Sequence, residues 1–297
     1  MGLRGGSTQG AYRLPDFLVI GAVKCGTTSL ASYLGAHESI FMASPKELRF
    51  FSHDWDRGLA WYASKFEKAS SDALVGEASP QYTQAPFLGG VPDRVASVIP
   101  AARLVYLVRD PMDQMRSFYR HRMFKGREKA PTLDIALTES PLYLAAASYG
   151  FQASLYLERF APEQLLIIDN ADLSAKRSET VNRILSFLGI DSPVPEDALS
   201  VELEQGAGKD FLPSHLSLPR RAWRANRRLT GKIPRRWRHS IRSSLAKPPP
   251  PSAFDISPNT KRWLAAKLEL DLIRVGQLAG GSLDDAVPNW LQRLADS

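Results

Sequence analysis

The ten residues from Gly21, GAVKCGTTSL, combine two glycines, one lysine and three hydroxyl side chains. Gly21 and Gly26 allow the backbone to bend so that successive N–H groups point inward, and a helix that begins near Thr27 adds its partial positive charge. Thr27, Thr28 and Ser29 contribute further hydroxyl donors. The segment therefore predicts a binding site for a phosphate-like anion; a strand-to-helix turn without a ligand is the alternative.

The lysine of this loop, Lys24, lies two residues before the second glycine. A nucleoside-triphosphate loop reads G-x-x-x-x-G-K-[ST], with its lysine after that glycine and a hydroxyl ligand for magnesium. Lys24 would instead place its ammonium in the bend of the loop, between a bound diphosphate-like group and the group that is transferred. The sequence demands no magnesium, and we expect no metal at this site.

A second candidate anion site follows the apolar run LVYLV, where Arg109, Asp110 and Pro111 are adjacent. Arg109 is expected at the carboxyl end of a strand, where ligands gather in open α/β sheets. Ser117 would lie two turns into the next helix, where its hydroxyl could share a phosphate with the guanidinium. A helix-capping salt bridge is the alternative reading. Two anion sites on one crevice predict a ligand with phosphates at both ends.

The elements that must position these residues alternate between short apolar runs and longer helical periods, which favours a parallel sheet with crossover helices. Strands are expected at 17–20, 74–76, 104–108 and 165–169, and helices from Thr27, Pro92, Pro111, Tyr149 and Ser178. A further helix is expected to run to Leu278 with Ser257 as its cap. We predict one α/β domain over 15–297, with C-terminal helices over about 257–297, after a flexible N-terminal arm over 1–14.

The composition is that of a globular chain, with 44% apolar and 23% charged residues among 297, which excludes collagenous and disordered classes. The formal charge of +7 points to an anionic ligand or surface. Residues 211–254 hold eleven Lys and Arg, no Asp or Glu, and the interleaved Trp223 and Trp237. We expect there either a solvated basic insertion or a lid that docks an acidic substrate or membrane headgroups.

Cys25 is the single cysteine, so an internal disulfide and a four-cysteine zinc site are excluded. No apolar run approaches the roughly 20 residues of a spanning helix, and the first residues lack the apolar core of a secretory signal. We expect a cytoplasmic protein, with peripheral contact between the basic segment and an anionic substrate or membrane as a further expectation.

Four blocks of the sequence together resemble the sulfotransferases that use 3′-phosphoadenosine 5′-phosphosulfate (PAPS), in the branch with heparan sulfate sulfotransferases and bacterial relatives. They are, in order, GAVKCGTTSL, KELRFFSHDWDRGLAWY, GEASPQY and LVYLVRDPMDQMRSFYRH, and YGFQASLYLERFAPEQLLIIDNADL extends the likeness to about residue 190. The resemblance implies a P-loop-containing three-layer α/β fold with a central, mainly parallel sheet flanked by helices. It also implies PAPS as donor substrate and no metal.

The resemblance also implies how the donor is held. The expected donor-binding residues are Lys24, Cys25, Gly26, Thr27, Thr28 and Ser29 at the 5′-phosphosulfate, and Arg109 and Ser117 at the 3′-phosphate. Lys24 would in addition stabilise the bridging oxygen as sulfate leaves.

The resemblance implies catalytic roles for two further residues. Glu47, in PKELRFF, stands where family members have a general base, which an acceptor needs because an alcohol is a poor nucleophile until its proton is taken. His121 aligns with a histidine near the active site in part of the family and could share acid–base work or bind substrate. The alternatives are a surface glutamate and a structural helix histidine.

The acceptor is predicted only as the hydroxyl or amine of a glycan, a glycolipid or a small molecule. Heparan-directed members carry a lysine in an E-K-[ST]-P block, whereas this chain has Glu77-Ala78-Ser79-Pro80. Three alternatives stay open: a P-loop kinase-like phosphoryl transferase, a nucleic-acid-binding protein acting through 220–242, and an inactive relative that only binds the nucleotide. We expect no nucleic acid partner, because the basic run has no zinc spacing or ribonucleoprotein motif.

Overall fold

The computed structural model describes residues 12–200 and 250–296. Most of the expected N-terminal arm (1–14) and of the basic segment (211–254) lies outside these residues. Five strands pair in parallel in the order β2-β3-β1-β4-β5. They are β1 (Phe17–Gly21), β2 (Ile40–Met42), β3 (Leu74–Ala78), β4 (Arg103–Val108) and β5 (Leu165–Asp169). The α/β fold with a parallel sheet is therefore confirmed.

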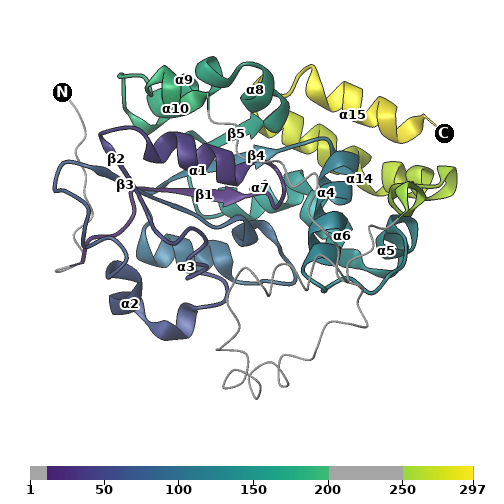
Figure 1. The fold of residues 1–297 in the computed structure, drawn as a ribbon, viewed down its shortest axis with the longest axis horizontal. Helices are drawn as coiled ribbons and strands as arrows, with labels where there is room; N and C mark the ends of the chain where they lie inside the picture. The colour runs from purple at the N-terminus through teal and green to yellow at the C-terminus, as the bar shows by residue number, and fades with distance from the viewer. Residues whose placement is uncertain (1–11, 201–249, 297) are drawn as a thin grey trace, which may run out of the picture.

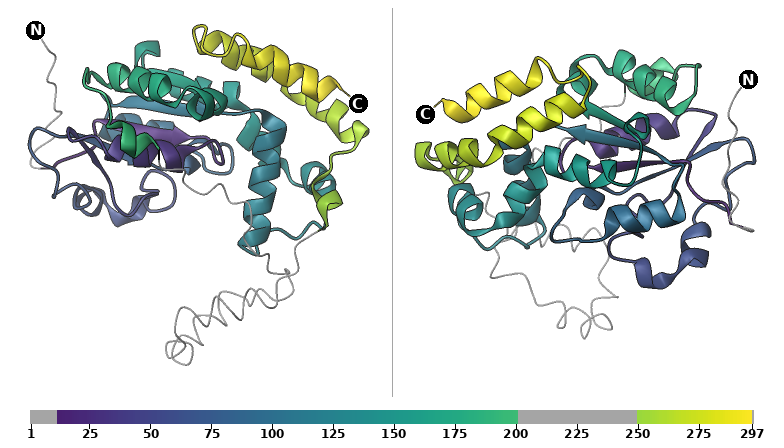
Figure 2. Two further views of the ribbon diagram at one scale, coloured as in Figure 1. Left: turned by 45° about the horizontal axis from the view of Figure 1, so that its top comes forward. Right: turned by 180° about the vertical axis from the view of Figure 1, so that it is seen from behind.

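Helices flank the sheet on both sides, with α1 and α9 on one side and α3 on the other (Figures 1 and 2). The described helices are α1 (Thr27–Gly35), α2 (Leu59–Ala63), α3 (Val91–Val98), α4 (Pro111–Phe124), α5 (Leu133–Glu139), α6 (Pro141–Ala147), α7 (Tyr149–Leu157), α8 (Asn170–Ala175), α9 (Arg177–Leu188), α10 (Glu196–Leu199), α14 (Pro258–Leu278) and α15 (Ala286–Ala295). Short 3-10 turns are η1 (Trp55–Arg57), η2 (Pro80–Thr83), η3 (Pro162–Gln164) and η5 (Pro251–Phe254). The long helix α14 packs on α7 and on α15, so the C-terminal helices pack on the α/β domain through α7.

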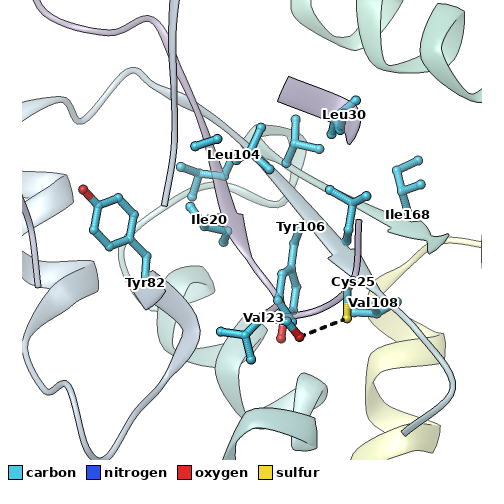
Figure 3. Close-up of a cluster of buried hydrophobic side chains, with 14 of the residues drawn as sticks. Ile20, Val23, Cys25, Leu30, Tyr82, Leu104, Tyr106, Val108 and Ile168 are labelled. Atoms are coloured by element: carbon cyan, nitrogen blue, oxygen red, sulfur yellow. Dashed lines mark hydrogen bonds between the residues drawn. The ribbon is translucent and has the colours of Figure 1, made fainter. Parts of the chain in front are cut away.

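The central strands are apolar on both faces because helices cover both faces of the sheet. Every residue of β1 is buried, and in β4 only the first residue is exposed. Figure 3 shows Ile20, Tyr106, Val108 and Ile168 in one cluster of buried side chains, together with Leu30 from α1. Burial of one such side chain stabilises the fold by about 1.5–3 kcal/mol, and this core fixes the strand ends where the candidate site lies.

The predicted elements match the structure closely along most of the chain. The expected helix starts at Thr27, Pro111 and Tyr149 are confirmed, and α3 and α9 begin one residue earlier than expected. The 257–278 helix is also confirmed, with Ser257 Oγ accepting the Thr260 N–H at 3.3 Å. Strand β3 runs two residues beyond its predicted end, and β2 was not predicted. Each helix within the described residues is too short or too polar to cross a bilayer.

Candidate active site

The glycine loop connects the central strand β1 to α1, and its geometry suits an anion. Gly26 is the left-handed N-cap of α1, with φ 90°, and no side chain caps the helix. The first N–H groups of a helix lack intrahelical partners and carry partial positive charge, so they are directed at the loop. A Cβ on Gly26 would come within 2.4 Å of Asn170 Nδ2. The bend at Gly26 therefore leaves no free room for a side chain.

The loop is held on its core side by the buried Cys25 and by two hydrogen bonds to other segments. The Cys25 side chain is fully buried, and its Sγ lies 3.8 Å from the hydroxyl of Tyr149 (Figure 3). Ala22 donates its N–H to Leu107 O at 2.6 Å, and the amide of Gln114 donates to Val23 O at 3.1 Å. Cys25 also donates its own N–H to the carbonyl of Ala22. Its side chain and its backbone therefore both fix the conformation of the loop.

The hydroxyl residues of the loop differ in exposure. Thr27 is buried, Ser29 is half-buried and Thr28 is exposed, while Lys24 is half-buried with φ 67°. Burial raises the pKa of Cys25 to about 12, and the charges of Arg109 and Lys24 oppose that rise. The charge of Arg109, which follows β4, therefore reaches the glycine loop, while two anion-binding groups on one crevice stay a prediction.

Arg109 follows β4 directly and lines a hollow of about 360 Å³ at the carboxyl ends of β4 and β5. The other lining residues are Asp110, Asp113, Asp169, Asn170, Ala171, Ser174, Ala286, Asn289, Trp290 and Arg293. From α15, Arg293 reaches Asp110 at 2.9 Å and Asp113 at 3.2 Å, so the C-terminal helix closes one wall. Ser117 is half-buried on α4 and is not among the lining residues.

Glu47 lies in the loop after β2, in a left-handed conformation with φ 65°. Its side chain is 40% exposed. The amide of Gln81 donates to Oε2 at 2.8 Å, and Lys46 Nζ donates to Oε1 at 3.2 Å. Partial burial by itself would raise the pKa of Glu47, but the charge of Lys46, the Gln81 hydrogen bond and Arg49 bring it below its ordinary value. Glu47 is therefore ionised at neutral pH and can accept a proton.

His121, on α4, belongs to the same electrostatic neighbourhood. Burial, together with the charges of Lys24 and Lys125, lowers the pKa of His121 to about 4, and the charge of Glu47 opposes this. The ring is therefore neutral at physiological pH and can either donate or accept a hydrogen bond. The three predicted catalytic residues come from three separate segments, and the charges of Lys24 and Glu47 both act on the His121 ring.

Several residues that support the site were not singled out from the sequence. Gln81 orients the Glu47 carboxylate, Gln114 ties α4 to the glycine loop, and Glu77 is fully buried below the Glu47 loop. Glu77 and Gln81 lie in GEASPQY, a block read only for its family likeness, and Gln114 lies in RDPMDQM. Within residues 12–200 and 250–296, no three His, Cys, Asp or Glu side chains gather as a metal site would require; the metal-free site stays a prediction.

The family model described as "Sulfotransferase domain" matches residues 14–205. The chain belongs to this sulfotransferase family. The match spans the glycine loop, the Glu47 loop and the Arg109 segment, and it confirms the predicted membership of the PAPS-dependent sulfotransferases and the predicted enzyme class.

Curated relatives of this sulfotransferase include far longer proteins. It is 32% identical over 202 residues to the human bifunctional heparan sulfate N-deacetylase/N-sulfotransferase 3, covering 60% of this chain and 22% of that protein. It is 37% identical over 125 residues to the membrane-associated sulfotransferase kil1 of Dictyostelium discoideum, covering 41% and 26%. The chain thus matches about a fifth to a quarter of the length of these relatives.

Among solved structures, the sulfotransferase from Alicyclobacillus acidocaldarius superposes with a TM-score of 0.63 and 22% identity. The match covers 94% of this chain and 99% of that one. The two proteins share a fold.

Proposed function

We propose that this sulfotransferase moves the sulfuryl group of PAPS to a hydroxyl or amine of an acceptor by in-line displacement. The observation that carries the proposal is the glycine loop itself, where the left-handed Gly26 leads into the uncapped N-terminus of α1. PAPS, when bound, supplies the activated sulfuryl group and the adenosine 3′,5′-bisphosphate leaving group. The bend at Gly26 and the open N-terminus of α1 fit its 5′-phosphosulfate.

Each residue has one task in this proposal. As the bond from sulfur to the bridging oxygen lengthens, Lys24 and the loop N–H groups stabilise the negative charge that grows there. Glu47 takes the proton of the attacking hydroxyl or amine, and the neutral ring of His121 hydrogen-bonds the acceptor or shares the proton. The hydroxyls of Thr27, Thr28 and Ser29 bind the 5′ end.

The 3′-phosphate is assigned to Arg109 and Ser117. Arg109 lines the hollow at the carboxyl ends of β4 and β5, and within the described residues no hydrogen bond or ion pair engages its guanidinium. A planar guanidinium can donate two parallel hydrogen bonds to a phosphate. Ser117 would join it from α4.

A glycan is the acceptor class to test first, because the human relative is named for heparan sulfate. The block Glu77-Ala78-Ser79-Pro80 lacks the lysine that heparan-directed members carry. A glycolipid and a small molecule therefore belong in the same panel. A cytoplasmic location and peripheral contact of the basic segment with an anionic substrate or membrane complete the proposal.

The test is transfer from ³⁵S-labelled PAPS to a panel of glycans, glycolipids and small alcohols and amines, with products identified by mass spectrometry. We expect acceptor-dependent labelling that survives EDTA and falls by about 100-fold or more in Lys24→Ala and Glu47→Ala, the scale of one charge-stabilising or general-base group. A parallel arm with ATP and magnesium tests phosphoryl transfer. Wild-type turnover in Glu47→Ala would remove the base assignment, and magnesium-dependent transfer from ATP alone would replace the proposal.

A further inference from the structure

Glu77, near the end of β3, is a carboxyl group enclosed by hydroxyl donors. Its side chain is fully buried, and no ion pair to it forms among the described residues. Tyr62 Oη donates to Oε2 at 2.5 Å, Ser79 Oγ donates to Oε1 at 2.5 Å, and Tyr82 Oη donates to Oε1 at 2.8 Å. Three hydroxyl protons are therefore committed to one carboxylate.

Two of these hydroxyls also hold the backbone of the loop that carries Glu47. Ser79 Oγ accepts the N–H of Arg49 at 3.0 Å, and Tyr82 Oη accepts the N–H of Phe51 at 3.4 Å. A hydroxyl has one proton to donate and lone pairs to accept with. Because Glu77 takes both protons, the lone pairs of Ser79 and Tyr82 are left to face the loop.

The segment held in this way has an unfavourable backbone. Glu47 and Arg49 both adopt left-handed conformations, with φ 65° and φ 54°, and neither is glycine. Such conformations persist only when the surrounding structure imposes them. The hydrogen bonds to Arg49 and Phe51, with that from Glu47 N–H to Ala78 O at 3.1 Å, impose the conformation here.

We propose that Glu77 is a positioning residue for sulfuryl transfer, which fixes the polarity of the Ser79 and Tyr82 hydroxyls and thereby sets the backbone that aims Glu47 at the acceptor. The inference rests on the proposed role of Glu47 as base.

A purely structural role explains this carboxyl group less well. Burial raises the pKa of Glu77, and the hydrogen bonds from Ser79, Tyr62 and Tyr82 offset that rise only in part. An acid with a raised folded-state pKa stabilises the fold fully only below its unfolded pKa, and the contribution is lost as the pH rises through the folded value. Ionisation of Glu77 therefore costs stability, and the fixed polarity of the two hydroxyls that hold the loop is what the carboxylate contributes in return.

The first variant is Glu77→Gln, which keeps the shape but replaces one acceptor oxygen by an amide donor. The hydroxyl that faces the new N–H must then turn, and a turned Ser79 or Tyr82 loses its hold on the loop. We expect kcat to fall by about 10- to 100-fold, the cost of a small displacement of a catalytic group. The Kd for adenosine 3′,5′-bisphosphate is expected to be unchanged, because the two hydroxyls fixed by Glu77 hold the Glu47 loop and not the glycine loop. Unchanged kcat in both Glu77→Gln and Tyr82→Phe would overturn the proposal.

Tyr82→Phe and Tyr62→Phe form a matched pair if Glu77→Gln folds poorly. Each removes one hydroxyl from Glu77, but only Tyr82 also accepts a loop N–H. We expect similar losses of thermal stability and a marked loss of kcat in Tyr82→Phe alone. Parallel losses of kcat in both variants would mean that Glu77 serves stability only, and would overturn the proposal.

The double variant Glu47→Gln/Glu77→Gln separates this inference from the proposed function. If Glu77 acts through Glu47, its substitution adds little once the base is gone, so the two effects are strongly non-additive. Additive losses would overturn the positioning role and leave the base in place. Wild-type turnover in Glu47→Gln alone would overturn the base assignment and, with it, the positioning role.

Discussion

The side-chain amide of Gln81 donates a 2.8 Å hydrogen bond to Oε2 of Glu47. The two residues are 34 positions apart, and the bond joins η2 to the loop after β2. It both orients the carboxylate and favours its ionised form. Glu47 is thus held by a neighbour that has no other role in the proposed chemistry.

Removal of this bond should change both the rate and its pH dependence. Gln81→Leu is expected to lower kcat by about tenfold, because the carboxylate loses its fixed orientation. The Gln81 hydrogen bond lowers the pKa of Glu47, so its loss should raise that pKa and move the acidic limb of the kcat profile to higher pH. Gln84→Leu, at the end of the same 3-10 turn, is the control. A lower kcat with an unshifted acidic limb would contradict this account.

The neighbourhood of Lys24, Glu47 and His121 can be tested by titration of the His121 ring, followed by NMR. Burial and the charge of Lys24 hold the pKa of His121 at about 4, whereas Glu47 opposes them. Lys24→Met should therefore raise this pKa, and Glu47→Gln should lower it further. Shifts of opposite sign would show that both charges act on the His121 ring. No shift in either variant would separate His121 from the proposed site.

The same titration has a consequence for stability. His121 has a folded-state pKa below its unfolded value of 6.5, so its contribution is fully present above pH 6.5 and is lost as the pH falls towards 4. His121→Gln should flatten the fall of Tm between these values.

Arg109 should decide whether the 3′-phosphate is recognised. We expect Arg109→Ala to weaken binding of adenosine 3′,5′-bisphosphate by about 10- to 100-fold, the worth of a charge-assisted hydrogen bond. Binding of adenosine 5′-monophosphate, which lacks that group, should change little. Arg116→Ala is the control. Arg116 is the residue before Ser117 on α4, and its guanidinium is already paired with Asp113. Calorimetry with both nucleotides measures the difference, and equal losses for both would contradict the assignment.

The sequence predicted the strongly patterned parts of this fold. Strands 104–108 and 165–169 were recognisable because helices cover both faces and their residues are almost uniformly apolar. Strand β2 was not recognisable, since Ile40–Met42 has three residues and pairs only with β3. At such a length, neither periodicity nor turn signals distinguish a strand from a loop.

The site was predictable where one segment carries the chemistry and not where contacts between segments create it. The residues of the loop around Lys24 predict an anion site by themselves. Gln114 instead matters because α4 reaches the glycine loop across 91 positions, and Glu77 because Ser79 and Tyr82 reach the loop backbone 30 and 31 positions away. These contacts depend on tertiary geometry, which local sequence does not encode.

Gly26 and Gly58 provide a matched pair to test whether the anion cradle depends on its glycine. Both have positive φ, 90° and 79°, but a Cβ on Gly58 meets no atom within 4 Å, whereas a Cβ on Gly26 displaces the Asn170 amide. Each substitution by alanine should cost roughly 1–3 kcal/mol of unfolding free energy from backbone strain. Only Gly26→Ala should weaken binding of adenosine 3′,5′-bisphosphate, because Asn170 lines the hollow with Arg109. Denaturant melts and calorimetry separate the two effects, and bisphosphate binding that Gly26→Ala leaves intact would argue against the cradle.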